Sequence, residues 1–374
     1  MRRILGGFAL LCFLTSSAVF AEVPKPLRKP QIETSKTAEK SSEKPAEYDL
    51  VPEQKEEEKE DVAAVLTEEE TEDEKEEKKE NPPVSYDLPD YKKNDKHVTG
   101  TAFLHEIGEE DTLMDIARYY EMGYVEMKSA NPGVDSWTPE RGKKIVIPKR
   151  NLLPRAEHKG LIVNLGEMRL YYFKDDGSIV TYPIGIGREG LQTPLGKTTI
   201  IKKLKRPSWY PTERMRKEKP GLPTRVRTGP ANPLGDRALY LGWPTFLIHG
   251  TNKPWGIGRR VSSGCIRMYP ENIRSLFLAV PVETKVSVVD QPIKLAWLED
   301  GFYIEAHPSR AQSDNIEMNG KISDDLLDKE IADDLKAFIE KAAGDKKDAL
   351  DWKAIAQIIK ERRGYPIKIL GQET

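Results

Sequence analysis

The chain has 374 residues, with 59 lysines and arginines against 61 aspartates and glutamates and a formal net charge of −2. At roughly 150 residues per domain, this length predicts two domains with chain to spare. Beyond the first 21 residues no apolar run approaches the roughly 20 residues of a membrane span, which excludes a polytopic membrane protein. Its 2 cysteines are too few for a disulfide scaffold or a Cys-rich zinc module.

The charges are distributed unevenly along the chain. Residues 53–80 contain 15 acidic and 5 basic residues, whereas residues 149–300 contain 26 basic and 13 acidic residues. The near-neutral total therefore hides an acidic tract and a basic domain. We predict that residues 22–98 form a disordered acidic linker, because their side chains cannot bury enough apolar surface to offset chain entropy.

The first 21 residues, 1–21, have the pattern of an export signal. Two arginines precede a short apolar stretch that runs to Leu14, and small residues end the segment at Ala21. This pattern is typical of a cleaved signal peptide, whereas a retained membrane anchor needs a longer apolar stretch. We therefore expect a periplasmic protein with no stable membrane insertion after signal cleavage. Cleavage after Ala21 removes Cys12 and leaves Cys265 as the single cysteine.

Residues 101–148 predict a small α+β unit with the order β-α-α-β. The expected elements are a strand at 102–107, a helix after the cap at 111–112, a second helix at 124–130 and a strand at 144–148. Because these pieces are complete within one short segment, we expect a self-contained unit that is separate from the cysteine domain.

The ordered motifs of this unit resemble a LysM module. They are the segments 108–113, 130–132 and 142–148. The LysM family binds glycans that contain N-acetylglucosamine, such as peptidoglycan, so the resemblance implies a glycan groove between two loops. The residues implied in that groove are Gly108, Asp111, Thr112, Asn131 and Pro132. The alternative is a small packing domain that has lost its ligand.

Residues 157–290 predict a mainly β domain, a sandwich or half-open barrel, with one clear helix at 270–280. Strands are expected at 161–165, 168–173, 179–184, 198–202, 238–241, 246–249 and 285–289. The last residues, 291–374, predict a hairpin around residues 300–301. Two amphipathic helices are expected after it, near 331–343 and 350–363.

The segment from His249 to Arg267 carries the residues suited to chemistry. Cys265 lies in the Gly-rich polar turn 262–265, 16 residues after His249. A thiol is nucleophilic as the thiolate, and a neighbouring histidine can take its proton. Backbone N–H groups at such a turn can stabilise an oxyanion, and an arginine can hold a carboxylate bidentately. The competing interpretation is a buried, inert cysteine and a satisfied core histidine.

The same segment resembles the YkuD catalytic domain of L,D-transpeptidases, in the ErfK/YbiS group. That family has a histidine, a spacer, and then Ser/Thr-His-Gly-Cys followed by one residue and Asn or Arg. The histidine is His249 here, and the end of the motif is Ser262-Ser263-Gly264-Cys265-Ile266-Arg267. Further matches at 183–187, 193–196 and 230–244 extend the resemblance over residues 157–290. One position departs from the pattern, because the second histidine of the family is replaced by Ser263.

The resemblance implies an L,D-transpeptidase that acts on tetrapeptide stems of peptidoglycan, without a cofactor or metal. Cys265 attacks the carbonyl of diaminopimelate, the third stem residue, while His249 takes the thiol proton, and D-alanine leaves as a thioester forms. The implied supporting residues are Gly250, Ser263 and Gly264 for the imidazole and the oxyanion, and Arg267 and Tyr240 for the substrate. An amine acceptor gives a 3-3 cross-link or attaches an outer-membrane lipoprotein, and water gives an L,D-carboxypeptidase.

Other functions fit the sequence less well. The 5 histidines are scattered and form no His-Glu-x-x-His motif, which argues against a metal site. The basic stretch 202–219 is also a pattern of nucleic-acid binding, but an exported protein rarely meets nucleic acid. Peptidoglycan carboxylates or a solvated loop face explain that stretch equally well. The rival function is a non-catalytic peptidoglycan-binding wall protein with a decayed β domain, and the intact His249/Cys265 pair argues against it.

Overall fold

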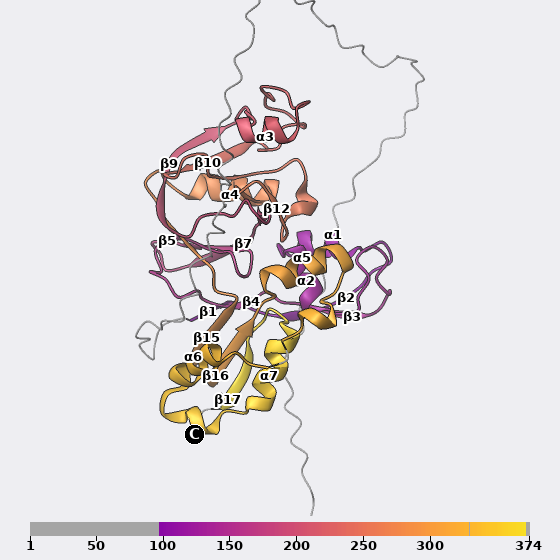
Figure 1. Cartoon of the computed structure of the whole chain (residues 1–374), viewed down its shortest axis with the longest axis vertical. Helices are drawn as coiled ribbons and strands as arrows, with labels where there is room; N and C mark the ends of the chain where they lie inside the picture. The colour runs from indigo at the N-terminus through magenta and orange to yellow at the C-terminus, as the bar shows by residue number, and fades with distance from the viewer. Residues whose placement is uncertain (1–96, 329, 372–374) are drawn as a thin grey trace, which may run out of the picture. The chain divides into compact units, whose positions relative to one another are not determined.

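A computed structural model of the protein describes residues 97–328 and 330–371, all of which belong to one structural unit (Figure 1). The predicted signal peptide and nearly all of the predicted linker lie outside the described residues. The linker prediction ends too late, because β1 (Val98–Gly100) begins within it and pairs with β4 (Arg150–Leu152). No helix of the described part is both long enough and apolar enough to cross a membrane.

The predicted mainly β domain is confirmed as one curled sheet of eight strands (Figure 1). In sheet order they are β13 (Ile266–Arg267), β11 (Leu247–His249), β10 (Arg237–Leu241), β9 (Gly196–Lys205), β14 (Lys285–Val289), β5 (Gly160–Asn164), β6 (Arg169–Phe173) and β7 (Ile179–Pro183). The pairs β11–β13 and β14–β5 are parallel, and the other pairs are antiparallel. The expected helix is α4 (Pro270–Ala279).

Five short elements of this domain were not predicted. They are β8 (Ile186–Gly187), α3 (Glu213–Glu218), the 3-10 helix η1 (Pro254–Gly256), β12 (Arg260–Ser262) and β13. Strands β8 and β12 pair in parallel as a separate small sheet. Each element is too short to leave a hydrophobic period in the sequence.

The apolar run at the start of the domain is explained by burial on both faces of β5. Leu161 and Val163 belong to the main core, which α4 also enters through Ile273 and Leu276. Ile162 points into a second cluster on the opposite face. A strand that is buried on both sides reads as a continuous apolar run and not as an alternation.

Residues 101–148 contain the predicted order β-α-α-β. The elements are β2 (Phe103–Glu106), α1 (Leu113–Tyr119), α2 (Tyr124–Ala130) and β3 (Lys144–Ile147), and β2 pairs with β3 antiparallel. A small core around Leu113, Met127 and Ile147 holds them together. Thr112 caps α1 by accepting a hydrogen bond from the backbone N–H of Asp115.

The expectation of a self-contained unit is wrong, because α2 is part of the core of the large sheet. All 7 residues of α2 are buried. Tyr124 and Val125 lie in the same hydrophobic cluster as the strands of the large sheet. Glu126 forms a buried ion pair with Arg169 of β6, with 2.6 Å between Oε2 and Nη2. Separating the two parts would therefore expose apolar surface and leave a buried charge unpaired.

The C-terminal residues form a second layered part around a three-stranded sheet (Figure 1). Its elements are β15 (Ile293–Leu298), β16 (Gly301–Ala306), α6 (Asp333–Ala343), η3 (Gly344–Ala349), α7 (Trp352–Glu361) and β17 (Ile367–Gly371). Between β16 and α6 the chain forms α5 (Arg310–Asn319) and η2 (Asp324–Leu326), and α5 packs beside α2 with Ile316 in the main core. The predicted hairpin and the two predicted helices, α6 and α7, are present, whereas α5 and β17 were missed. Helices α6 and α7 pack on the sheet through a core of their own.

A buried charged cluster joins this sheet to the eight-stranded sheet. The Nζ atom of Lys294 lies 2.6 Å from Glu167 Oε2 and 2.8 Å from Glu305 Oε1, and it donates to the carbonyl of Leu152 at 2.7 Å. The two carboxylates and His307 are close enough together to suit a metal ion. The lysine ammonium already provides the positive charge among them, so we interpret the cluster as a structural junction.

Replacing Glu126 by alanine tests how strongly α2 is tied to the large sheet. We expect the free energy of unfolding to fall by about 3–5 kcal/mol, because Arg169 would remain buried without its partner. Urea unfolding followed by circular dichroism measures this change. Glu109→Ala is the matched control, since the Glu109–Arg141 pair is exposed at 74% and 70% and should contribute less than about 1 kcal/mol. Equal effects of the two substitutions would contradict the prediction.

Candidate active site

The predicted histidine ends one strand, and the predicted cysteine directly precedes the strand that pairs with it in parallel. His249 ends β11 and lies opposite Arg267 of β13, and Ile248 lies opposite Ile266. Both isoleucines are fully buried in the main core. Side chains alternate between the faces of a strand, so His249 and Arg267 share the other face, and Cys265 joins them directly before β13. His249 and Cys265 are 16 residues apart in the sequence, and the pairing of β11 with β13 brings them to diagonally neighbouring positions.

The imidazole of His249 is buried, with 3% of the residue exposed, and the main chain fixes its orientation. Its Nδ1 atom lies 2.5 Å from the carbonyl oxygen of Gly250. A carbonyl oxygen only accepts hydrogen bonds, so Nδ1 carries the proton and Nε2 keeps a free lone pair. This is the tautomer that a base needs when it takes a proton through Nε2.

The turn that presents the thiol is held by two hydroxyl groups. Ser262 Oγ donates to the carbonyl of Cys265 at 2.6 Å and accepts from the N–H of Gly264 at 3.2 Å. Thr193 Oγ1 donates to the carbonyl of Gly264 at 2.8 Å. Gly264 has a φ of +107°, and a Cβ there would lie 3.1 Å from the ring of Phe246, so this position favours glycine. We did not predict roles for Ser262 and Thr193, although Ser262 lies within the motif.

The thiol itself is half-buried, and Cys265 is a free cysteine. Its Sγ atom lies 3.5 Å from the carbonyl oxygen of Thr245, to which it donates. Ser263, the residue before Gly264, is also half-buried.

The two residues predicted to bind substrate lie on the same face of the sheet as the thiol. Tyr240 of β10 pairs with Leu247 of β11, and the Nζ atom of Lys202 lies 5.7 Å from the centre of its ring. The Nε atom of Arg267 is buried and has no hydrogen-bond partner among residues 97–328 and 330–371. Burial lowers the pKa of Arg267, which indicates a desolvated guanidinium. Such a group is suited to an incoming carboxylate.

Comparison with known proteins identifies the family. Residues 158–288 match the YkuD family model, described as the L,D-transpeptidase catalytic domain. The protein named "Probable L,D-transpeptidase YbiS" of Escherichia coli strain K12 is 44% identical over 207 residues, which cover 54% of this chain and 67% of that protein. "Probable L,D-transpeptidase ErfK/SrfK" of the same strain is 41% identical over 233 residues, or 60% and 74% of the two chains.

A third relative covers more of the chain. "Probable L,D-transpeptidase ErfK/SrfK" of Salmonella typhimurium strain LT2 is 35% identical over 295 residues, which cover 76% of this chain and 91% of that protein. The chain belongs to the L,D-transpeptidase family. The match to the family model begins just before β5 and ends within β14, so it includes both His249 and Cys265 of this L,D-transpeptidase.

The groove residues implied by the LysM resemblance lie at the ends of α1 and α2, and most have structural contacts. Asp111 Oδ2 accepts from the N–H of Gly108 at 2.8 Å. Thr112 caps α1. The side-chain amide of Asn131 bonds both backbone groups of Val146, at 2.7 and 2.8 Å. These side chains therefore hold the two loops in place, and the family model that matches does not extend to them.

Two exposed residues of the α2–β3 loop complete this surface. Pro132 is exposed, and Trp137, which we did not predict, is 68% exposed. The loop lies beside the start of α1, because the N–H of Leu113 donates to the carbonyl of Ser136 at 3.0 Å. An aromatic ring is thus presented next to the predicted groove.

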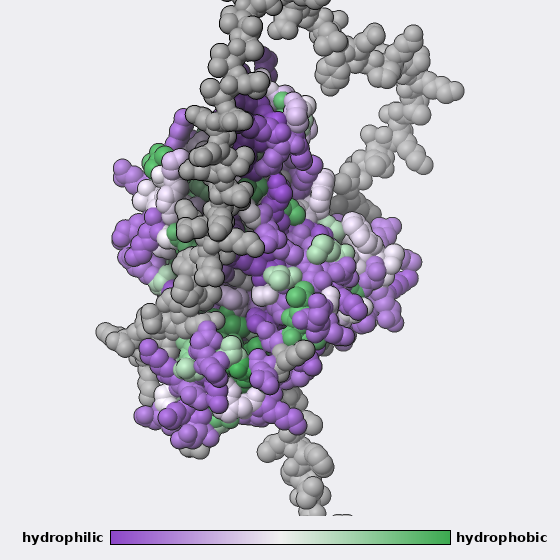
Figure 2. All heavy atoms as spheres, viewed as in Figure 1, coloured by the Kyte–Doolittle hydropathy of each residue, from purple (hydrophilic) through white to green (hydrophobic). Residues whose placement is uncertain are grey.

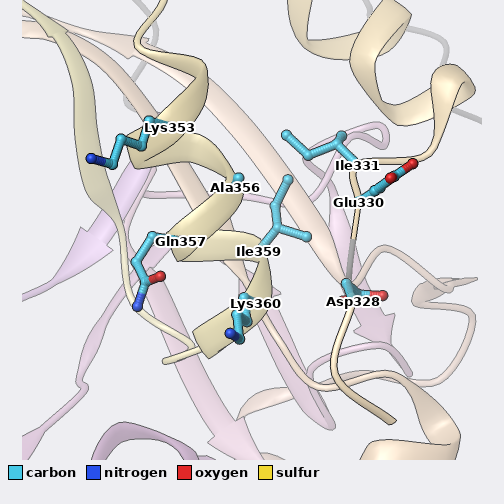
Figure 3. Close-up of a pocket in the computed structure, with 8 residues that line it drawn as sticks. All are labelled: Asp328, Glu330, Ile331, Lys353, Ala356, Gln357, Ile359 and Lys360. Carbon is cyan, nitrogen blue, oxygen red and sulfur yellow. The ribbon is translucent and has the colours of Figure 1, made fainter. Parts of the chain in front are cut away.

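Two other surface features are the basic stretch of the sequence and a pocket. Hydrophilic residues gather over α3 and the adjacent end of β9 (Figure 2), where the basic stretch 202–219 lies. Part of its charge is balanced locally, because Lys217 and Arg214 pair with Glu213 and Glu218. A pocket in the C-terminal part (Figure 3) is lined by Asp328, Glu330, Ile331, Lys353, Ala356, Gln357, Ile359 and Lys360. It contains none of the predicted site residues.

Burial keeps both members of the His249–Cys265 pair neutral at rest. Burial and, to a smaller extent, the charge of Arg267 lower the pKa of His249 to about 3, against the opposing effect of the hydrogen bond to Gly250. Burial also raises the pKa of the Cys265 thiol, against the opposing influence of the Leu247 backbone and of Arg267. In this L,D-transpeptidase the resting pair at neutral pH is therefore a thiol and an imidazole and not an ion pair.

The pH dependence of thiol alkylation tests this resting state. The raised pKa of Cys265 leaves little thiolate below the ordinary thiol value of about 8.5, so the rate of reaction with iodoacetamide should rise about tenfold per pH unit between pH 6 and 8. Mass spectrometry of the intact protein measures the rate, with glutathione alkylated in parallel as the reference thiol. A rate that is flat from pH 5 to 8 would instead indicate a thiolate–imidazolium pair.

Proposed function

We propose that this L,D-transpeptidase is a periplasmic enzyme that acts on peptidoglycan tetrapeptide stems through a cysteine thioester. The observation that carries the proposal is the arrangement of Cys265 and His249 on one face of adjacent strands, with the imidazole held in the basic tautomer by Gly250. An inert core cysteine would not need a neighbouring histidine with a free lone pair.

The proposed reaction has two halves. Cys265 Sγ attacks the carbonyl carbon of the third stem residue as its proton passes to Nε2 of His249. The tetrahedral intermediate collapses, the bond to D-alanine breaks, and the amine takes the proton from the imidazolium. An acceptor amine then attacks the thioester, giving its proton to the imidazole, and the thiol is released. A stem amine gives a 3-3 cross-link, a lipoprotein amine attaches that protein, and water gives L,D-carboxypeptidase activity.

The oxyanion of the intermediate needs backbone donors from the cysteine turn. We predicted Ser263 and Gly264 for this role, but the N–H of Gly264 already donates to Ser262 Oγ. The N–H groups of Ser263 and Cys265 are therefore the proposed donors. Arg267, whose Nε has no hydrogen-bond partner within the described part of the chain, is proposed to hold a carboxylate of the stem beside the reacting carbonyl.

The unit at 101–148 is proposed to bind the glycan strand as a LysM module. The order β-α-α-β and the exposed Trp137 beside the start of α1 support this role. An aromatic face offers the apolar contact that a sugar ring can cover. Glycan binding would hold the stem near the cysteine. In the rival function, a non-catalytic wall protein would bind the glycan without acting on the stem.

Incubation with defined muropeptides, analysed by mass spectrometry, tests the reaction. Cys265→Ala should abolish the thioester and all products, and His249→Gln should slow acylation by about two to four orders of magnitude, the usual contribution of a general base. Turnover in Cys265→Ala would refute the mechanism. A folded wild-type protein that forms neither thioester nor product would favour the non-catalytic wall protein.

Ser263→Ala is the matched control for the histidine substitution. Ser263 replaces the histidine that the family has at this position, and a hydroxyl is not a base at neutral pH. We expect this variant to lose less than about tenfold in acylation rate, or about 1.4 kcal/mol of barrier. A loss as deep as that of His249→Gln would show that the site depends on the serine.

Glycan binding is tested separately at the exposed aromatic residue. Trp137→Ala should weaken sedimentation with purified sacculi by about tenfold, and it should leave acylation of Cys265 by soluble muropeptides within twofold. Tyr119→Ala, which removes another exposed aromatic residue of the same unit, is the control and should change neither quantity. Equal sedimentation of the Trp137→Ala variant and the wild type would count against the glycan groove.

A further inference from the structure

The strand that leads into the cysteine turn is held by a helix from the C-terminal part. Glu317 of α5 accepts the backbone N–H of Arg260, the first residue of β12, with 2.6 Å between N and Oε1. The guanidinium of Arg260 donates to Asp314 Oδ2 at 2.6 Å and to the carbonyl of Arg310 at 2.9 Å. Only 4% of the Arg260 side chain is exposed, so water competes little for these hydrogen bonds.

Strand β12 is otherwise held by its pairing with β8, which includes a hydrogen bond of 3.0 Å from the N–H of Arg188 to the carbonyl of Ser262. It is 3 residues long, and its pairing with β8 is irregular between Arg260 and Ser262. A short, irregular pair fixes its residues less firmly than a regular ladder. The three hydrogen bonds to α5, all made by Arg260, anchor the strand at its start.

The other end of β12 touches the residue that performs the proposed chemistry. Ser262 ends the strand, and its hydroxyl bonds the carbonyl of Cys265 and the N–H of Gly264. Because Arg260 lies only two residues before Ser262, a displacement of Arg260 would also move the turn that carries the thiol. Displacements of about 1 Å at a reacting group can cost roughly 100-fold in rate.

We propose that Glu317 and Asp314 of α5 are positioning residues for Cys265, acting through Arg260 and Ser262. The inference rests on the proposed role of Cys265 as the nucleophile. Helix α5 lies beyond residue 288, where the match to the catalytic family model ends. The C-terminal part thus completes the geometry of the catalytic turn as well as adding a separate core.

The substitution pair Glu317→Ala and Glu317→Gln tests the proposal, because glutamine keeps a carbonyl oxygen for the Arg260 N–H and alanine does not. We expect Glu317→Ala to lower kcat with muropeptide and the acylation rate of Cys265 by about tenfold to 100-fold, with KM within twofold. Glu317→Gln should stay within about threefold of wild type. Met318→Ala, at a 75% exposed position on the same helix, is the control and should change neither rate.

Thermal unfolding separates positioning from stability. All rates are measured at least 15 °C below the midpoint of each variant. At such temperatures a purely structural role would leave kcat unchanged, and that result would overturn the proposal, as would a loss confined to KM. If Glu317→Ala does not fold, Asp314→Ala and Asp314→Asn provide the same comparison at the guanidinium. Failure of the proposed function is a different result, since wild-type Cys265 would then not be acylated at all.

Discussion

The parallel pairing of β11 with β13 is the constraint on which the site depends. Its register places His249 opposite Arg267 and directs two isoleucines into the core, so the imidazole, the guanidinium and the thiol share one face. A shift of β13 by one residue against β11 would turn Arg267 and Cys265 away from the face that carries His249. The buried Ile266 therefore protects the arrangement, because such a shift would also turn it out of the core.

Burial sets the chemistry that this arrangement can perform. The same low-polarity surroundings lower the pKa of His249 to about 3 and raise the pKa of Cys265, so neither group is charged in the resting protein at neutral pH. The proton of the thiol must then move during the attack itself. A neutral thiol resists chance alkylation and oxidation better than a thiolate does.

Much of the site could be predicted from the sequence, because its signals are local. A lone cysteine in a Gly-rich turn and a histidine at a strand end are visible in the chain, and the family resemblance joins them. Ser262 and Thr193 were missed because hydroxyl groups that bond to the backbone leave no pattern of their own. The sequence of α5 contains a capping box that begins at Ser309, and a glycine follows its last residue. Its few apolar residues, however, do not form the hydrophobic period of a helix clearly enough to predict one.

The largest error was to expect residues 101–148 to form a unit that is independent of the large sheet. The order β-α-α-β at 101–148 was correct, yet sequence periodicity does not show which core a helix enters. Helix α2 has buried residues on every side, and part of it completes the core of the large sheet. The backbone N–H groups of Tyr124 and Val125, which begin α2, donate to the carbonyls of Ile257 and Gly258, at 3.3 and 3.2 Å. The loop before β12 is thus bonded to α2 and β12 itself to α5, so both flanking parts of the chain meet at the segment that leads to Cys265.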